Sequence, residues 1–169
     1  MLTLTSDGRL PAGRHPATLA EIEDLFVTRA PHSEARKRIF DAFTLYFTLV
    51  QDLIGRGTLW VNGGFCTHKE EPPKDIDLVI IANPEDVQRF GQPEEERLCQ
   101  LLTLQGVNVG MPQAFSPRVQ PMGGLIDAFF ILSDDFDAVK MWDALWSSVK
   151  GADGNIIEGA TKGYLEVSW

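Results

Sequence analysis

The apolar positions in the first third of the chain recur at the spacing of two helices. Thr18, followed three residues later by Glu21, is a capping-box pattern that predicts a short helix running to about Thr28. Ser33 predicts the start of a second, longer helix. The apolar stripe of this helix, which we interpret as core, consists of Ile39, Phe43, Tyr46, Phe47, Val50 and Ile54. The helix is expected to end at one of the two glycines that follow, Gly55 or Gly57.

Three further stretches have the composition of β-strands. Residues 58–62 form a short β-type run that ends in Gly63-Gly64. Residues 76–82 are the strongest strand signal, because their tail is continuously apolar, as is typical of a central strand covered on both faces. Residues 124–132 form the third clear strand.

The remaining segments predict a mixed sheet with helices packed against it. An extended N-terminal arm is expected over 1–16, a new element from Pro84 and a helix over 93–104. Residues 106–123 are expected to form a loop with at most one short strand, followed later by a helix that is capped by Asp134 or Asp135 and runs to about Val149. Residues 154–169 predict a hairpin or two edge strands, with Lys162-Gly163 near the turn. No internal repeat is present, and 169 residues suit one core. We therefore expect a single domain over 1–169 of the α+β class (an α/β mixed sheet).

The net charge and composition of the chain argue against nucleic acid and membranes as partners. A net charge of −9 argues against extensive non-specific binding to nucleic acid, which depends on neutralising phosphates with Lys and Arg. The chain has no apolar run of bilayer length and no basic-then-apolar start, so we expect a cytoplasmic protein with no membrane partner. Cys66 and Cys99 are expected to be free thiols.

A local basic cluster interrupts this acidic chain near the start of the second helix. It consists of His32, Arg36, Lys37 and Arg38. Two interpretations are open: contact with an anionic substrate, or the solvated first turns of a helix.

The segment from residue 59 to residue 80 carries the strongest indication of chemistry. The strand at its start ends in Gly63 and Gly64, which permit a tight turn and the close approach of a ligand to backbone N–H groups that can bind phosphate. Ten residues later come Asp75 and Asp77, which would share one face of a strand. Two carboxylates so close repel each other unless a cation lies between them, and their oxygens suit Mg²⁺ or Mn²⁺.

A third acid fits the same site. Asp127 lies inside an otherwise apolar strand, where a lone carboxylate is expensive to bury without a partner. If that strand lies beside the strand of Asp77, three carboxylates converge and can share two metal ions with a triphosphate. The alternative is that Asp127 faces water from an edge strand and that Asp75 and Asp77 are surface acids at a strand entry.

Gly-Gly, a ten-residue spacer and Asp-x-Asp between apolar residues together resemble the nucleotidyltransferase superfamily of DNA polymerase beta. The layout also resembles a small bacterial family described only as nucleotidyltransferase-like. The resemblance implies a nucleotidyltransferase fold, in which Gly63 and Gly64 bind nucleotide phosphates. It also implies that Asp75, Asp77 and Asp127 are the metal ligands and catalytic acids. Many members of the superfamily carry Ser at the position of Gly64, so this chain would rely more on backbone N–H groups.

The spacer and its surroundings offer further candidates. Thr67 and Lys69 are candidate nucleotide-binding residues, and Lys74 is a second lysine that can act as a point charge on phosphate. For each lysine a solvated loop position is an equal alternative. Three other residues lie in or near the spacer. We interpret Trp60 as a core residue, Asn62 as the end of the strand or a support of the turn, and His68 as a pocket residue.

The sequence thus leaves three functions open. The first is a Mg²⁺-dependent nucleotidyltransferase that moves an NMP from an NTP substrate to a protein, RNA or small-molecule acceptor, as in toxin–antitoxin or defence systems. The second is a non-catalytic nucleotide-binding, regulatory or antitoxin-type module on the same fold. The third is a metal-dependent hydrolase that uses water as acceptor.

Overall fold

A five-stranded mixed sheet organises the protein. The computed structural model describes residues 2–110, 114–151 and 154–169. Its strand order is β1 (Gly13–Pro16), β9 (Gly163–Ser168), β2 (Gly57–Asn62), β3 (Ile76–Ala82) and β6 (Ile126–Leu132). The β1–β9 and β3–β6 pairs are parallel, and β2 is antiparallel to both of its neighbours. The predicted mixed α+β class is therefore confirmed.

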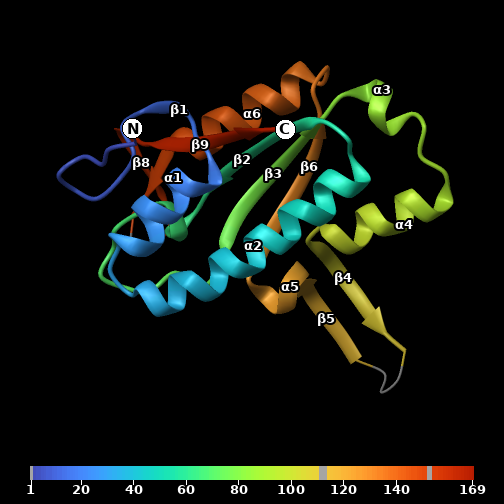
Figure 1. The fold of residues 1–169 in the computed structure, drawn as a ribbon, viewed down its shortest axis with the longest axis horizontal. Helices are drawn as coiled ribbons and strands as arrows, with labels where there is room; N and C mark the ends of the chain where they lie inside the picture. The colour runs from blue at the N-terminus through green and yellow to red at the C-terminus, as the bar shows by residue number, and fades with distance from the viewer. Residues whose placement is uncertain (1, 111–113, 152–153) are drawn as a thin grey trace.

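Helices cover both faces of this sheet (Figure 1). One face is covered mainly by α2, and α6 packs on the opposite face. The remaining helical elements are short and connect the strands. The helical elements are α1 (Leu19–Glu23), the π-helix η1 (Asp24–Thr28), α2 (Ser33–Leu53), the 3-10 turn η2 (Gly64–Cys66), α3 (Pro84–Val87), α4 (Gln92–Leu101), α5 (Pro121–Gly124) and α6 (Phe136–Ser147).

The inner strand β3 is covered by helices on both of its faces. Leu78 and Ile80 point into the core under α2, whereas Val79 and Ile81 point into the second core under α6. All four side chains are at most 8% exposed, so the prediction of a strand covered on both faces is confirmed. Asp77 has the same parity as Val79 and therefore faces the α6 side of the sheet.

The predicted helix starts are largely confirmed. Thr18 and Glu21 form the expected capping box, in which the Glu21 backbone N–H donates to Thr18 Oγ1 and the Thr18 N–H donates to Glu21 Oε2. The helix that follows continues as a π-helix to Thr28. In α2 the N-cap is His32 in the left-handed region rather than Ser33, which is the first helical residue. Asp135 caps α6 by accepting from the Ala138 N–H at 3.0 Å.

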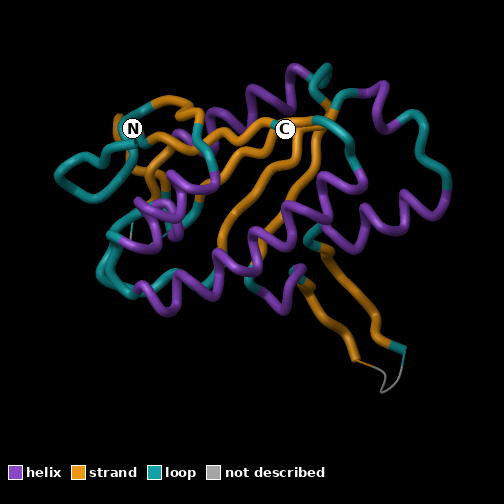
Figure 2. Tube along the Cα trace, viewed as in Figure 1, coloured by secondary structure: helices purple, strands orange, loops and turns teal. Residues whose placement is uncertain are grey.

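The loop predicted over 106–123 is wrong. The described residues there form an antiparallel ribbon of β4 (Leu104–Val109) and β5 (Ala114–Val119), followed by α5; residues 111–113 lie outside the described residues. The ribbon extends away from the rest of the molecule (Figure 2). Pro117 is tolerated within β5 because this strand has only one partner and needs only alternate N–H groups for pairing.

The prediction for the C-terminal tail is also wrong in its pairing. Strand β8 (Ile156–Thr161) pairs with β7 (Ser148–Lys150), whereas β9 enters the main sheet between β1 and β2. β9 is accordingly a buried inner strand, in which Tyr164 and Leu165 are fully buried, and not an edge. The N-terminal arm supplies the edge strand β1 and places Leu10 in the core.

The structure contradicts the interpretation that Arg36 of the basic cluster contacts an anionic substrate. Its guanidinium is fully buried and donates to the carbonyl oxygens of Pro31 at 2.7 Å, Phe26 at 3.2 Å, Phe65 at 2.7 Å and Thr67 at 2.5 Å. Burial lowers its pKa. Arg36 therefore joins the start of α2 to η1 and to the turn that follows β2. Lys37 and Arg38 are exposed, as a solvated helix face predicts.

Two smaller expectations concern thiols and membranes. Cys66 and Cys99 are free, as predicted. Burial raises the pKa of Cys66 to about 12, so this thiol stays protonated at neutral pH and is a poor nucleophile. Among the described residues, none of the helices combines the length and apolar character that a membrane span requires.

Candidate functional site

Asp77 and Asp127 stand side by side. They are direct partners in the parallel register of β3 and β6, so both carboxylates project from the same face of the sheet. The condition that the sequence analysis set for convergence of the acids, that these two strands lie side by side, is therefore met. Asp75 precedes β3 by one residue and accepts a hydrogen bond from Gln120 Nε2 at 3.1 Å.

The three acids have different partners. Asp127 is 6% exposed, accepts from Thr103 Oγ1 at 2.7 Å and forms an ion pair with Arg118 of β5. Asp77 forms no hydrogen bond or ion pair with another described side chain, and only the more distant charges of Lys162 and Arg118 favour its ionised form. Its pKa is raised to about 6, first by burial and then by the negative charges of Asp75 and Asp127. Asp77 is therefore the acid whose ionised form most needs a cation.

The side chains around Asp75, Asp77 and Asp127 determine whether a divalent metal ion can bind there. Among residues 2–110, 114–151 and 154–169, no three His, Cys, Asp or Glu side chains are already arranged to hold one, since Arg118 and Gln120 engage two of the acids. The donor set itself suits Mg²⁺ or Mn²⁺, because it consists of hard carboxylate oxygens and includes Asp77, a partly buried carboxylate with a raised pKa. Asp75, Asp77 and Asp127 are thus the residues that would hold the metal.

The turn after β2 is shaped around Asp77. Gly63 has φ of +87° and ψ of −168°, a conformation that L side chains rarely adopt. A Cβ atom at Gly63 would lie 1.8 Å from Asp77 Oδ2, so glycine is required here by the acid itself. Gly64 is different, since the nearest atom to a Cβ there is the Pro73 Cβ at 3.9 Å.

This difference predicts opposite outcomes at two adjacent glycines. Gly63→Ala should destabilise the protein by about 2–3 kcal/mol through backbone strain and should displace the Asp77 carboxylate. Gly64→Ser should change the stability by less than about 0.5 kcal/mol, because its Cβ would make only an ordinary van der Waals contact with Pro73. Urea unfolding of both variants measures the contrast. Equal destabilisation by the two substitutions would contradict the assignment of Gly63 as the sterically required glycine.

The spacer residues divide into structural and site-facing groups. Thr67 is buried, and its hydroxyl donates to the Gly64 carbonyl at 2.8 Å, so it braces the turn although it also borders the cavity described below. The His68 Nε2 atom is hydrogen-bonded to the Leu25 carbonyl oxygen at 2.8 Å. Lys69 faces the cavity, whereas Lys74 is exposed and is absent from its described lining.

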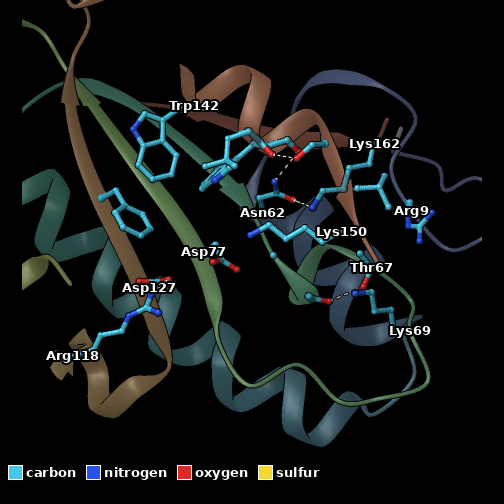
Figure 3. A pocket seen from close by; sticks show the side chains of 17 residues that line it. Arg9, Asn62, Thr67, Lys69, Asp77, Arg118, Asp127, Trp142, Lys150 and Lys162 are labelled. Carbon is cyan, nitrogen blue, oxygen red and sulfur yellow. Dashed lines mark hydrogen bonds and ion pairs between the residues drawn. The ribbon is translucent and has the colours of Figure 1, made fainter. Parts of the chain in front are cut away.

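A cavity of about 480 Å³ lies beside the glycine turn and the paired acids Asp77 and Asp127 (Figure 3). Its volume is in the range of small-molecule sites. Asp77, Asp127, Gly63 and Gly64 line it. Five of the 15 Lys and Arg residues of this acidic chain line it as well, namely Arg9, Lys69, Arg118, Lys150 and Lys162. Such a concentration of cations in a chain of net charge −9 is typical of an anion-binding site.

Lys162 is the most embedded cation of this group. Its Nζ donates to Asn62 Oδ1 at 2.9 Å, and Asn62 Nδ2 in turn donates to the Trp146 carbonyl at 3.1 Å. Burial lowers the pKa of Lys162; Asp77 partly opposes this effect, and Lys69 and Arg9 add to it. A bound anion would relieve this unfavourable environment of the ammonium group.

Four of the five cations that line the cavity were not predicted from the sequence. Arg9 lies in the N-terminal arm, Lys150 in β7, Lys162 between β8 and β9, and Arg118 in β5. No local pattern connects these four segments. Trp60, by contrast, is core as predicted, with its Nε1 bonded to Glu166 at 2.9 Å.

Comparison with known proteins places the chain in one family. Residues 2–168 match the family of unknown function DUF6932, and the chain belongs to this family. No curated protein matches the chain. No solved structure matches it either.

Proposed function

We propose that this protein is a divalent-metal-dependent nucleotidyltransferase that moves an NMP from an NTP to an acceptor hydroxyl. The observation that carries the proposal is one cavity in which the register-paired acids Asp77 and Asp127 lie between the glycine turn and a rim of five cations. A nucleoside triphosphate with its metal presents the complementary charges. The arrangement also supports the nucleotidyltransferase fold, with the glycine turn on the strand antiparallel to that of Asp77.

The residues of the chain would divide the work as follows. The backbone of Gly63 and Gly64 and the side chains of Lys69, Lys150 and Lys162 hold the triphosphate, mainly by charge and position. Asp75, Asp77 and Asp127 hold Mg²⁺ or Mn²⁺, which when bound offsets the charge on the phosphates and polarises the reacting oxygens.

The transfer itself replaces a phosphoanhydride bond of the NTP by a phosphoester bond to the acceptor. The acceptor oxygen attacks the α-phosphorus, the bond from that phosphorus to the bridging oxygen breaks, and pyrophosphate leaves. One of the carboxylates receives the proton of the acceptor hydroxyl. The acceptor is a protein, an RNA or a small molecule.

The test combines binding with transfer. Thermal unfolding is measured with Mg²⁺ alone, with each NTP alone and with both, because a ligand that binds the folded state stabilises it by mass action. At 100 times Kd the gain is about 2.7 kcal/mol, which raises Tm by several degrees in a domain of this size. α-Labelled NTP is then incubated with candidate RNAs, proteins and nucleosides. Absence of any stabilisation at millimolar NTP with Mg²⁺ contradicts the proposal, and binding without transfer to any acceptor identifies a non-catalytic module instead.

A further inference from the structure

The cavity has an apolar wall whose purpose the acids and cations do not explain. Phe129 and Trp142 line this wall, and their ring centroids are 4.6 Å apart at an interplanar angle of 41°. Phe129 follows Asp127 by two residues on β6 and so projects from the same face of the sheet. Trp142 comes from α6, which crosses above that face.

Trp142 differs from its neighbour Trp146 in burial. Trp146 is 6% exposed and belongs to the core between α6 and the sheet. Trp142 is only partly buried, although it packs edge-to-face against Trp146 with centroids 5.8 Å apart. Part of an indole ring therefore remains uncovered inside a polar cavity, where an apolar surface is unfavourable unless a ligand covers it.

The order of chemical groups along the cavity is informative. Figure 3 shows Asp77 between Trp142 on one side and Lys150 and Lys162 on the other. Asp127 lies toward the Trp142 side. Apart from Arg118, which is paired with Asp127, the order of environments across this view is therefore aromatic, then acidic, then cationic. A nucleotide has the matching sequence of an aromatic base, a phosphorus that must meet the metal and acids, and terminal phosphates.

Two polar side chains of the cavity lining already donate to backbone carbonyls. Asn62 Nδ2 donates to the Trp146 carbonyl at 3.1 Å, and Ser148 Oγ donates to the Leu145 carbonyl at 2.6 Å. Strong discrimination among bases requires hydrogen bonds to the base edge, and these two donors are engaged elsewhere. Stacking on an aromatic ring tolerates every base, because each base has a π-face.

We infer that the nucleobase stacks against the Trp142–Phe129 wall, with the terminal phosphates directed toward Lys150 and Lys162, and that the base is bound by its face with little selection among the four bases. This inference rests on the proposed function and specifies how that site orients its substrate. Trp142 acts as a positioning residue, because it places the α-phosphorus over the acids without touching the reacting atoms.

Isothermal titration calorimetry in Mg²⁺ separates the base from the phosphates. The probes are ATP, GTP, CTP, UTP, ribose 5-triphosphate and inorganic tripolyphosphate. In the wild type we expect ATP to bind roughly tenfold more tightly than ribose 5-triphosphate, as stacking of one base predicts. We expect the four NTPs to lie within about fivefold of one another, with purines tighter than pyrimidines.

The variants assign that difference to Trp142. Trp142→Leu should weaken ATP binding roughly tenfold and leave tripolyphosphate binding unchanged, while Trp142→Phe should retain most of the ATP affinity. Phe136→Ala is the matched control, since Phe136 is an aromatic residue of the same helix that is 70% exposed and is absent from the described cavity lining. It should bind every probe as the wild type does.

Each failure has a distinct meaning. Equal wild-type affinity for ATP and ribose 5-triphosphate, or unchanged ATP binding in Trp142→Leu, would overturn the inference and leave the proposed function intact. A preference above about fiftyfold for one base would overturn recognition by the face alone. If no NTP and no tripolyphosphate binds the wild type, the proposed function fails and the inference fails with it. The comparison of ATP with ribose 5-triphosphate in the wild-type protein tests the inference even if Trp142→Leu does not fold.

Discussion

Asp77→Asn is expected to lower nucleotide transfer by about a thousandfold and, at the same time, to make the protein more stable when metal is withheld by EDTA. The loss follows because removing a metal ligand forfeits several kcal/mol of transition-state stabilisation, and each 1.36 kcal/mol is tenfold in rate. The gain follows because the Asp77 charge is buried beside two other acids. Asparagine keeps the shape of the side chain and removes that charge.

The pH dependence of this gain has a definite sign. The pKa of Asp77 is about 6 in the folded protein, against an ordinary value of 3.8. Between these values the folded protein binds a proton that the unfolded chain does not, so wild-type stability falls as pH rises from about 4 to about 6. Asp77→Asn lacks this loss. Its advantage should be near zero at pH 4 and reach about 2 kcal/mol above pH 7, with some screening by water allowed for.

Asp127→Asn is the matched control with the opposite expectation. Asp127 accepts from Thr103 and pairs with Arg118, so neutralising it should destabilise the protein by about 1–2 kcal/mol. Urea unfolding in EDTA at pH 4, 6 and 8 measures both variants. A loss of stability in Asp77→Asn at pH 8 would show that Asp77 is a structural acid. Transfer activity retained in Asp77→Asn would refute its catalytic role.

Arg36→Met is expected to destabilise the protein by about 4 kcal/mol, the largest stability effect predicted for this chain. The substitution keeps an apolar stem of similar length but leaves the buried carbonyls of Phe26, Phe65 and Thr67 without their donor. Each buried acceptor left unpaired costs about 1–3 kcal/mol, and partial rearrangement should reduce the sum. Because two of these carbonyls belong to the turn after β2, tripolyphosphate binding should weaken too.

Neighbouring residues of α2 supply the control. Arg38→Met removes the same charge from an exposed position and should change the free energy of unfolding by less than about 0.5 kcal/mol. Arg36→Lys should be intermediate, because an ammonium group cannot reproduce the planar fork that serves four carbonyls. A cost below about 1 kcal/mol for Arg36→Met, measured by urea unfolding, would show that the carbonyls find other donors.

The sequence by itself determined the elements whose signals are local. A capping box such as Thr18 with Glu21 satisfies the backbone groups of one helix turn, and it needs no distant partner. The apolar run of β3 identified a strand buried on both faces for a similar reason, since composition reports burial directly. The sequence placed Asp77 and Asp127 each within an otherwise apolar strand, whereas their common face depends on the register between the two strands.

Pairing and register were decided by the tertiary structure. The residues of β9 do not show which strands they pair with, because the partners β1 and β2 lie far away in the chain. The β4–β5 ribbon was obscured by Gly106 and Pro117, which are turn-forming residues in most sequences. Here Gly106 adopts a positive φ of 62° within β4, and Pro117 lies in a strand with a single neighbour.

The roles of the basic residues were the feature that the sequence predicted least well and that depended most on the tertiary structure. Arg36 has the sequence context of a solvated helix residue, and only the convergence of carbonyls from two loops makes its burial favourable. Arg9, Lys150 and Lys162 reach one cavity from segments that are far apart in the chain. Sequence periodicity reports what lies on one element, whereas a binding site is set by how elements meet. The acids were therefore found in the sequence, and the cations and the aromatic wall that face them were supplied by the fold.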